Sequence, residues 1–215
     1  MKKVISTILA IGVAAFSFVS CGTTEEVSKL TTDWAVAELR DQENCGYFFT
    51  TPELGQFDMI ESEFKKSAGY QKAAYGMIFG YSKPTSDGKL NNYIRFEINT
   101  DGEYACYKCM GGAYTDLVEE NNSGTAYFYE NGAIVKGYDQ VNSIRVEKNS
   151  NGKWDVSCNG TKLIANIAPI SKATNGAMAF FSVGKKNEEK LPDETVKVTY
   201  RITDSKFHVE EKKWL

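Results

Sequence analysis

The chain has 215 residues, with 25 lysines and arginines against 28 aspartates and glutamates, and 42% of its residues are hydrophobic. Removal of Lys2 and Lys3 with a leader would leave 23 basic residues against 28 acidic ones, a net charge of −5. This mildly acidic balance argues against nucleic acid or an anionic membrane face as a partner. The length is sufficient for one sizeable hydrophobic core.

The first twenty residues have the pattern of a secretory signal peptide. Lys2 and Lys3 precede an uncharged, mostly apolar run from Val4 to Val19, which is too short for a membrane-spanning helix. The sequence FVSCG around Cys21 resembles the lipobox of bacterial lipoproteins, although Phe18 stands where leucine is usual. The resemblance implies that Cys21 is diacylated and becomes the first mature residue. An ordinary secreted protein with a chance cysteine is the alternative.

Residues 22–32, GTTEEVSKLTT, lack apolar periodicity and are predicted to form a polar tether. Several acyl chains on Cys21 would suffice to hold the protein on a membrane. We therefore expect a signal peptide at 1–20, a lipidated tether at 21–32 and one domain at 33–215. The expected location is the bacterial cell envelope, at the outer membrane or cell surface. The periplasmic side of a membrane is an alternative location.

From Gly46 onward the sequence alternates between strand-like runs and turn residues. Only Trp34 to Gln42 is compatible with a short helix. Many short strands at this spacing predict an all-β sandwich or barrel. The predicted strands outside the central region are 46–51, 57–64, 74–82, 92–99, 103–110, 113–118, 177–184 and 196–203.

The stretch from 141 to 167 predicts a meander of three strands. Trp154, Val156 and Cys158 alternate with polar residues, the period of a half-buried strand. Asn151-Gly152 and Asn159-Gly160 separate the three runs and tolerate the positive φ of tight hairpin turns. We expect Trp154 to lie in the core of the protein.

Several motifs occur in an order that resembles a known family. They are YGMIFGY (75–81), NYIRFEI (92–98), DGEYACYK (101–108), NSIRVE (142–147), WDVSCNGT (154–161), GAMAFFSVG (176–184) and VKVTYRITD (196–204). Together they are similar to the concanavalin A-like lectin/glucanase jelly roll, a group that includes laminin-G-like modules and 3-keto-disaccharide hydrolase-like domains. The resemblance implies two stacked antiparallel sheets with one concave face, and implies no activity by itself.

Acidic residues in FDMIESEF are candidates for glycoside hydrolysis. Alternation places Glu61 and Glu63 on one strand face, and a carboxylate pair about 5 to 9 Å apart can cleave a glycosidic bond. Laminarinase-type relatives carry E-x-D-x-E, whereas here Ser62 replaces the central acid and Asp58 falls on the opposite face. Solvated carboxylates on an outward strand face are the simpler interpretation.

Histidine and cysteine chemistry is limited. His208 is the only histidine, so Ser-His or Cys-His catalysis would require it. Cys106 and Cys109 are too far apart along one strand to pair with each other, since three residues span roughly 10 Å. Cys106 and Cys158 share faces with apolar residues and are expected in the core. A zinc site that also used Cys45 would lack a second C-x-x-C, and no metal is expected.

Twelve tyrosines provide the feature best suited to binding. Tyr93, Arg95 and Glu97 alternate with apolar residues and therefore share one face, which we expect to be exposed. An aromatic face flanked by charged hydrogen-bonding groups suits a sugar. The alternative is a cross-strand charge ladder of Arg95 and Glu97 with Arg145 and Glu147.

Loop residues also allow calcium, although no D-x-D-x-D-G string is present. The candidate ligands are Asp87, Asn91, Asp101, Asn121 and Asp139. We therefore predict a lipid-anchored envelope module that binds a glycan or protein ligand. The alternative is a glycan-cleaving hydrolase of the same fold that uses carboxylates near Glu61 and Glu63.

Overall fold

The computed structural model describes residues 29–40, 48–50, 54–81, 92–118, 128–170, 175–181 and 195–207. The strands in these ranges form two antiparallel sheets. The described residues contain no helix that is long and apolar enough to cross a membrane. The strands are β1 (Ala35–Arg40), β2 (Phe48–Thr50), β3 (Phe57–Ala68), β4 (Tyr75–Tyr81), β5 (Asn92–Ile98), β6 (Glu103–Met110), β7 (Ala113–Asp116), β8 (Tyr129–Glu130), β9 (Val141–Lys148), β10 (Trp154–Cys158), β11 (Thr161–Ile167), β12 (Asn175–Phe181) and β13 (Thr195–Phe207). The predicted all-β, two-sheet antiparallel sandwich is confirmed.

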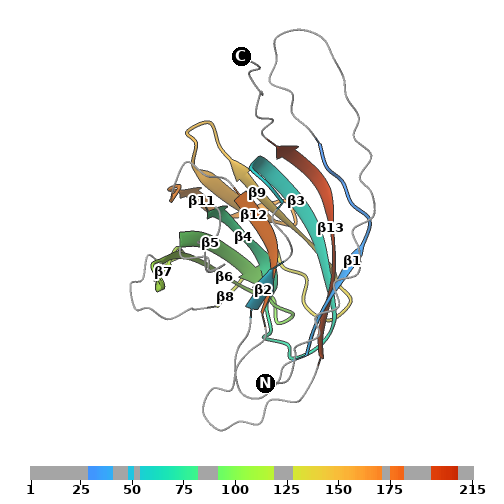
Figure 1. The fold of residues 1–215 in the computed structure, drawn as a ribbon. Helices are drawn as coiled ribbons and strands as arrows, with labels where there is room; N and C mark the ends of the chain where they lie inside the picture. Colours follow the sequence, from blue (N-terminus) through green and yellow to red (C-terminus); the bar gives the residue numbers. More distant parts are fainter. Residues whose placement is uncertain are drawn as a thin grey trace, which may run out of the picture.

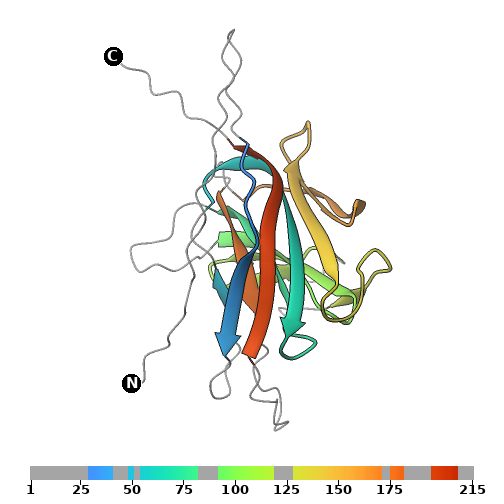
Figure 2. The ribbon, with the colours of Figure 1, turned by 90° about the vertical axis from the view of Figure 1, so that its right-hand side faces the viewer.

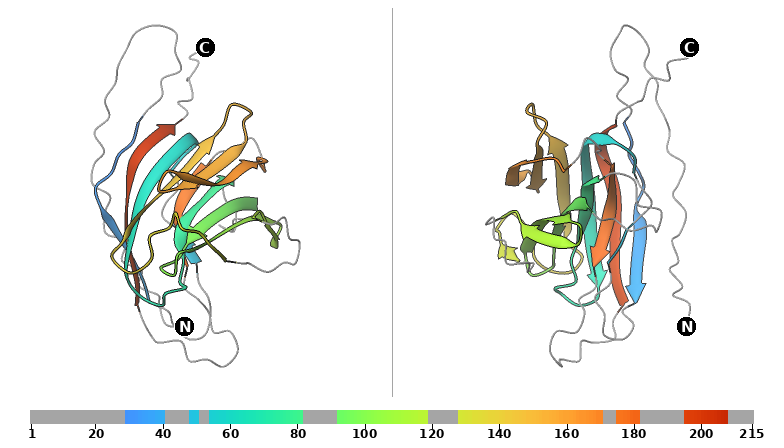
Figure 3. Two further views of the ribbon diagram at one scale, coloured as in Figure 1. Left: turned by 180° about the vertical axis from the view of Figure 1, so that it is seen from behind. Right: turned by 60° about the vertical axis from the view of Figure 1, so that its left-hand side comes forward.

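The two sheets are built from strands that are distant in sequence (Figure 1). Sheet A has the order β1-β13-β3-β9-β10-β11, and Figure 2 shows β1, β13, β3 and β9 side by side. Sheet B has the order β2-β12-β4-β5-β6-β7, with β8 also paired to β6. Figure 3 shows the same arrangement from behind and from one side. The pairs of β13 with β1 and β3, of β3 with β9, and of β12 with β2 and β4 join strands distant in sequence, while β4 to β7 and β9 to β11 are consecutive neighbours.

The main core lies between the sheets and is centred on Trp154. Its side chain is fully buried, and its ring centroid lies 5.4 Å from those of both Phe57 and Phe79. Cys106 and Cys158 belong to the same core cluster. The predicted burial of Trp154 and of these two cysteines is confirmed.

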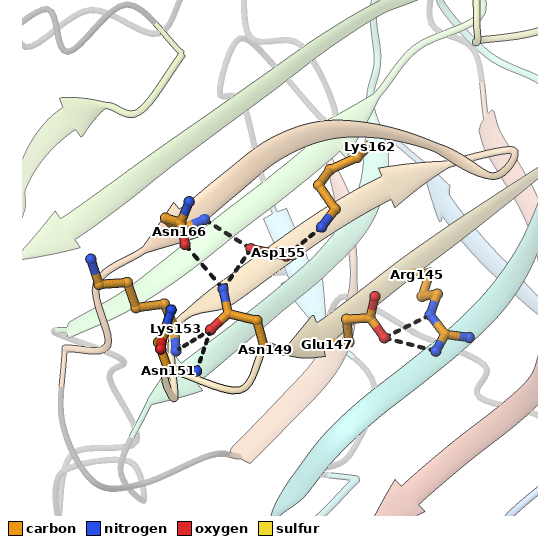
Figure 4. Close-up of polar contacts among 8 residues, drawn as sticks. All are labelled: Arg145, Glu147, Asn149, Asn151, Lys153, Asp155, Lys162 and Asn166. Carbon is orange, nitrogen blue, oxygen red and sulfur yellow. Dashed lines mark hydrogen bonds and ion pairs between the residues drawn. The ribbon is translucent and has the colours of Figure 1, made fainter.

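The predicted meander corresponds to β9, β10 and β11, with both hairpin turns where expected. Asn159 and Gly160 have φ of 50° and 79°, the left-handed values that this tight turn requires. The side chain of Asp155 on β10 joins β11 to the turn that follows β9 (Figure 4). It accepts hydrogen bonds from Lys162 Nζ at 2.6 Å, from the Asn166 backbone N–H at 2.8 Å and from Asn149 Nδ2 at 3.1 Å. These polar contacts fix the end of the meander.

Hydrogen bonds outweigh burial in setting the acidity of Asp155. Burial of this side chain opposes ionisation, but the bonds from Asn166, Lys162 and Asn149 favour the charged form, and the pKa is lowered from its usual value. Asp155 therefore stabilises the folded protein in its ionised state.

The segment considered as a short helix is instead a strand. Residues 35–40 pair with β13 over their whole length, with Ala37 opposite Val198. Ala37 is 8% exposed while Val36 is 40% exposed, the alternation of a strand with one face on the core. Pairing with a long neighbouring strand prevailed over the helix propensity of the alanines.

Part of the predicted tether is bound to the sandwich. The Thr32 N–H donates to the Ile202 carbonyl at 3.0 Å, and the Leu30 N–H donates to Ser205 Oγ at 2.7 Å. Leu30 also packs against the main core. The contacts of the sandwich therefore begin at least as early as Leu30, three residues before the expected boundary at Asp33.

Lys66 is a buried cation near the end of β3. It is 1% exposed, and its Nζ donates to the carbonyl oxygens of Ala73, at 2.7 Å, and Tyr70. A buried ammonium requires such partners to replace its hydration. Lys66 therefore ties the loop between β3 and β4 to the sandwich.

Candidate functional site

The face of sheet B that is turned away from sheet A, here called the outer face, carries the predicted ligand-binding residues. Ile94 and Phe96 lie in the main core, so the alternating Tyr93, Arg95 and Glu97 point to the outer face. The shared face is as predicted, but the expected exposure is wrong. Tyr93 and Glu97 are each 2% exposed, and the Arg95 side chain is 15% exposed.

The burial has a physical reason, because the outer face of sheet B has a hydrophobic cluster of its own. A β-bulge at Gly80, which has φ of 70°, interrupts the alternation of β4 and directs Tyr81 to this cluster rather than to the main core. Both faces of β4 and β5 are therefore packed. The members of the cluster are Ala74, Ile78, Tyr81, Tyr93, Cys109 and Ala177, with Phe128 partly buried against them.

Within this apolar setting Arg95, Glu97 and Tyr107 form a compact polar group, here called the outer-face cluster. Arg95 Nη2 donates to Glu97 Oε1 at 3.0 Å and to the Tyr107 hydroxyl oxygen at 2.7 Å. The Tyr107 hydroxyl in turn donates to Glu97 Oε1. The Arg95 guanidinium lies over the Tyr107 ring, with its carbon 4.4 Å from the ring centroid. The three side chains thus hold one another in a fixed arrangement.

The cluster perturbs the acid–base properties of its members. Burial raises the pKa of the Glu97 carboxyl, although Arg95 and the hydrogen bond from Tyr107 partly oppose this shift. Burial also raises the pKa of the Tyr107 hydroxyl well above its usual value, so that this group remains protonated and able to donate. Perturbed groups of this kind gather at functional sites more often than elsewhere.

Two further tyrosines border the cluster. The hydroxyl oxygens of Tyr93 and Tyr114 are 3.2 Å apart, within hydrogen-bonding distance. The ring of Tyr114 meets the ring of Tyr107 edge-on, with centroids 6.2 Å apart, and Tyr114 is 38% exposed. The aromatic surface therefore continues from the buried cluster to solvent at β7.

Sequence reasoning missed Tyr107, although a signal for it was present. In the β5–β6 hairpin Arg95 lies directly opposite Tyr107. A two-residue turn at Asp101-Gly102 would have placed Arg95 opposite Lys108, whereas the loop has three residues, 100–102, and places Arg95 opposite Tyr107. The available signal was alternation in β6, because Tyr107 follows the core residue Cys106 and therefore points to the outer face. The hydrogen bonds of the cluster depend on side-chain packing and had no sequence signal.

The structure places Glu61 and Glu63 on sheet A, away from this cluster. Glu61 accepts hydrogen bonds from Arg145 Nη1 at 3.2 Å and Ser143 Oγ at 2.9 Å, and Glu63 forms an ion pair with Arg201 at 2.7 Å. Both glutamates are partly exposed. The geometry favours the interpretation of these acids as strand-surface carboxylates in ion pairs.

The alternative prediction, one charge ladder of Arg95 and Glu97 with Arg145 and Glu147, is wrong. Arg145 and Glu147 form an ion pair at 2.7 Å on sheet A (Figure 4), whereas Arg95 and Glu97 lie on sheet B. The two pairs belong to different layers and do not continue one another. Asp58, the third acid of the strand motif, forms an ion pair with Lys148 at 3.3 Å.

The cysteines and metal candidates add no second site among the described residues. Cys106, Cys109 and Cys158 are buried, and within the described ranges no three His, Cys, Asp or Glu side chains gather closely enough to hold a metal ion. Of the residues considered above for lipidation, catalysis or metal binding, Cys21, Cys45, Asp87, Asn91, Asn121 and His208 lie outside the described residues.

No protein-family model and no curated protein matches the chain. Solved structures similar to it include the carbohydrate-binding module CBM66 of Bacillus subtilis, at 9% identity and a TM-score of 0.46, covering 91% of this chain and 94% of that one. The β-glucanase of Bacillus licheniformis shows 10% identity and a TM-score of 0.42, with 90% and 82% covered. The alginate lyase vAL-1 from Chlorella virus shows 13% identity and a TM-score of 0.45, with 94% and 93% covered. Such distant likeness assigns no activity, so the functional argument rests on the outer-face cluster.

Proposed function

We propose that the outer face of sheet B binds a glycan, and that the outer-face cluster is the polar centre of this site. The observation that carries the proposal is the ion pair of Arg95 and Glu97, buried with Tyr107 inside an apolar surface. Buried ion pairs are weak contributors to stability, because desolvation of both charges offsets their attraction. A role in recognition accounts for their presence better than a role in folding does.

The chemistry of the face suits a sugar. A sugar ring has apolar C–H surfaces for aromatic contact and hydroxyl groups that need directional hydrogen bonds. Tyr114, which reaches solvent, offers the first, and the cluster of Arg95, Glu97 and Tyr107 offers the second. Charge-assisted hydrogen bonds are about twice as strong as neutral ones, so the cluster would dominate the polar contacts.

The hydrolase alternative has less support from the geometry. It relied on Glu61 and Glu63, which lie on the other sheet and each bind an arginine. Glycoside hydrolysis needs two carboxyl groups that face one glycosidic bond, and each of these glutamates is instead held in an ion pair with an arginine of its own sheet. We therefore favour binding over cleavage, with a protein ligand as a second possible outcome of a screen.

A glycan-array screen of the mature chain carrying Cys21→Ser tests the proposal. We expect binding to at least one glycan, and a loss of about tenfold in affinity for Tyr107→Phe, which removes one hydroxyl from the site. Glu63→Gln on sheet A is the matched control and should bind as the parent protein does. Equal affinity of Tyr107→Phe and the parent, with melting curves unchanged, would contradict the assignment of this face.

We further propose that a lipid on Cys21 holds the module on a membrane of the bacterial cell envelope. The basis is the sequence FVSCG directly after the apolar run. In a Triton X-114 partition the parent protein should enter the detergent phase and Cys21→Ser the aqueous phase. Retention of Cys21→Ser in the detergent phase would place the anchor elsewhere.

A further inference from the structure

The two carboxylate oxygens of Glu97 have different surroundings. Oε1 accepts hydrogen bonds from Arg95 Nη2 and from the Tyr107 hydroxyl. Oε2 is also buried, but it accepts no hydrogen bond from the described residues. A buried acceptor without a donor typically costs about 1–3 kcal/mol, and more when it is charged. Such an atom calls for a specific explanation, since buried polar groups are nearly always paired.

The positive charge of Arg95 faces Glu97 within the cluster, although its buried Nε donates no hydrogen bond to the described residues. One of its nitrogens contacts both Glu97 and Tyr107, and its guanidinium covers the Tyr107 ring. Arg95 and Glu97 together carry no net charge. An anionic ligand at this place would meet the Glu97 carboxylate, whose charge already balances that of Arg95, and like charges across an interface cost several kcal/mol. A hydroxyl group can donate to Glu97 Oε2 and also accept from Arg95 Nε.

We propose that the outer-face cluster selects uncharged glycans, and that Glu97 Oε2 accepts a hydrogen bond from a ligand hydroxyl. This inference rests on the proposed function and names its ligand class. An O–H group supplies the donor that Oε2 lacks and adds no charge to a balanced pair. Arg95 is the cluster member with the most solvent exposure in its side chain, so the ligand approaches over this residue and displaces the atoms that cover Oε2.

The experiment compares neutral glycans with uronate-bearing and sulfated glycans on one array, using the mature chain with Cys21→Ser. The parent protein should bind neutral glycans only. Glu97→Gln removes the compensating charge and leaves Arg95 uncompensated. It should therefore lose about tenfold or more in affinity for the neutral ligand and gain binding to anionic glycans. Glu63→Gln serves as the control for the same chemical change on sheet A and should preserve the selectivity of the parent.

The outcomes separate the inference from the function on which it rests. Binding of anionic glycans by the parent protein, with a loss in Tyr107→Phe, would overturn the inference and leave glycan binding on this face in place. Failure of the parent to bind any glycan would overturn the proposed function and the inference together. If Glu97→Gln does not fold, as judged by circular dichroism, the selectivity of the parent and the loss in Tyr107→Phe still decide the matter.

Discussion

Replacement of Trp154 by alanine should lower the free energy of unfolding by about 3–5 kcal/mol. The side chain is fully buried between the sheets and contacts the rings of Phe57 and Phe79. A tryptophan buries about 150–250 Å², and at about 25 cal/mol per Å² this burial corresponds to roughly 4–6 kcal/mol, of which alanine retains a small part. A loss of this size is a large share of the stability of an ordinary domain.

Urea unfolding followed by circular dichroism measures this loss. Trp34→Ala is the matched control, because Trp34 is 41% exposed and the Arg201 guanidinium carbon lies 4.7 Å from its ring centroid, an interaction of about 0.5–1 kcal/mol. Trp154→Phe should be milder than Trp154→Ala, since it keeps an aromatic ring and Trp154 Nε1 has no hydrogen-bond partner to lose among the described residues. A Trp154→Ala cost within about 1 kcal/mol of the Trp34→Ala cost would refute the central position of Trp154.

Three further predictions concern polar and aromatic groups. The pKa of Asp155 in the folded protein is lowered, below an unfolded value of about 3.9, so its stabilisation is present at neutral pH and is lost as the pH falls through the folded value. The stability difference between the parent and Asp155→Asn, from urea titrations at several pH values, should therefore shrink below about pH 4; a constant difference would contradict the pKa direction. Lys66→Met should destabilise by about 2 kcal/mol or more in urea, because the buried Ala73 carbonyl loses the Lys66 donor and the Tyr70 carbonyl loses one of its two donors, whereas the more exposed Lys65→Met should have little effect. Tyr93→Ala should lower the melting temperature by several degrees more than Tyr114→Ala, since Tyr93 is 2% and Tyr114 38% exposed; equal shifts would show that the outer face is solvated.

The candidate site was predictable in part. Alternation in β5 correctly placed Tyr93, Arg95 and Glu97 on one face, because side chains in a strand have a period of two. The expectation that this face is exposed to solvent was wrong. Alternation distinguishes the two faces of a strand, but it does not reveal whether other side chains also bury the second face. The bulge at Gly80 adds Tyr81 to the hydrophobic cluster on the outer face. A bulge depends on how two strands pair rather than on one strand alone.

The sequence alone determined the local features of this protein. The Asn-Gly turns and the alternation around Trp154 are short-range signals, and they specified the β9–β11 meander and its buried face. Only the tertiary structure decided that residues 35–40 form a strand against β13, and that Arg95, Glu97 and Tyr107 bind one another. The physical reason is that these outcomes depend on partners distant in sequence, whose pairing energy exceeds local propensity and whose packing removes water from charged groups.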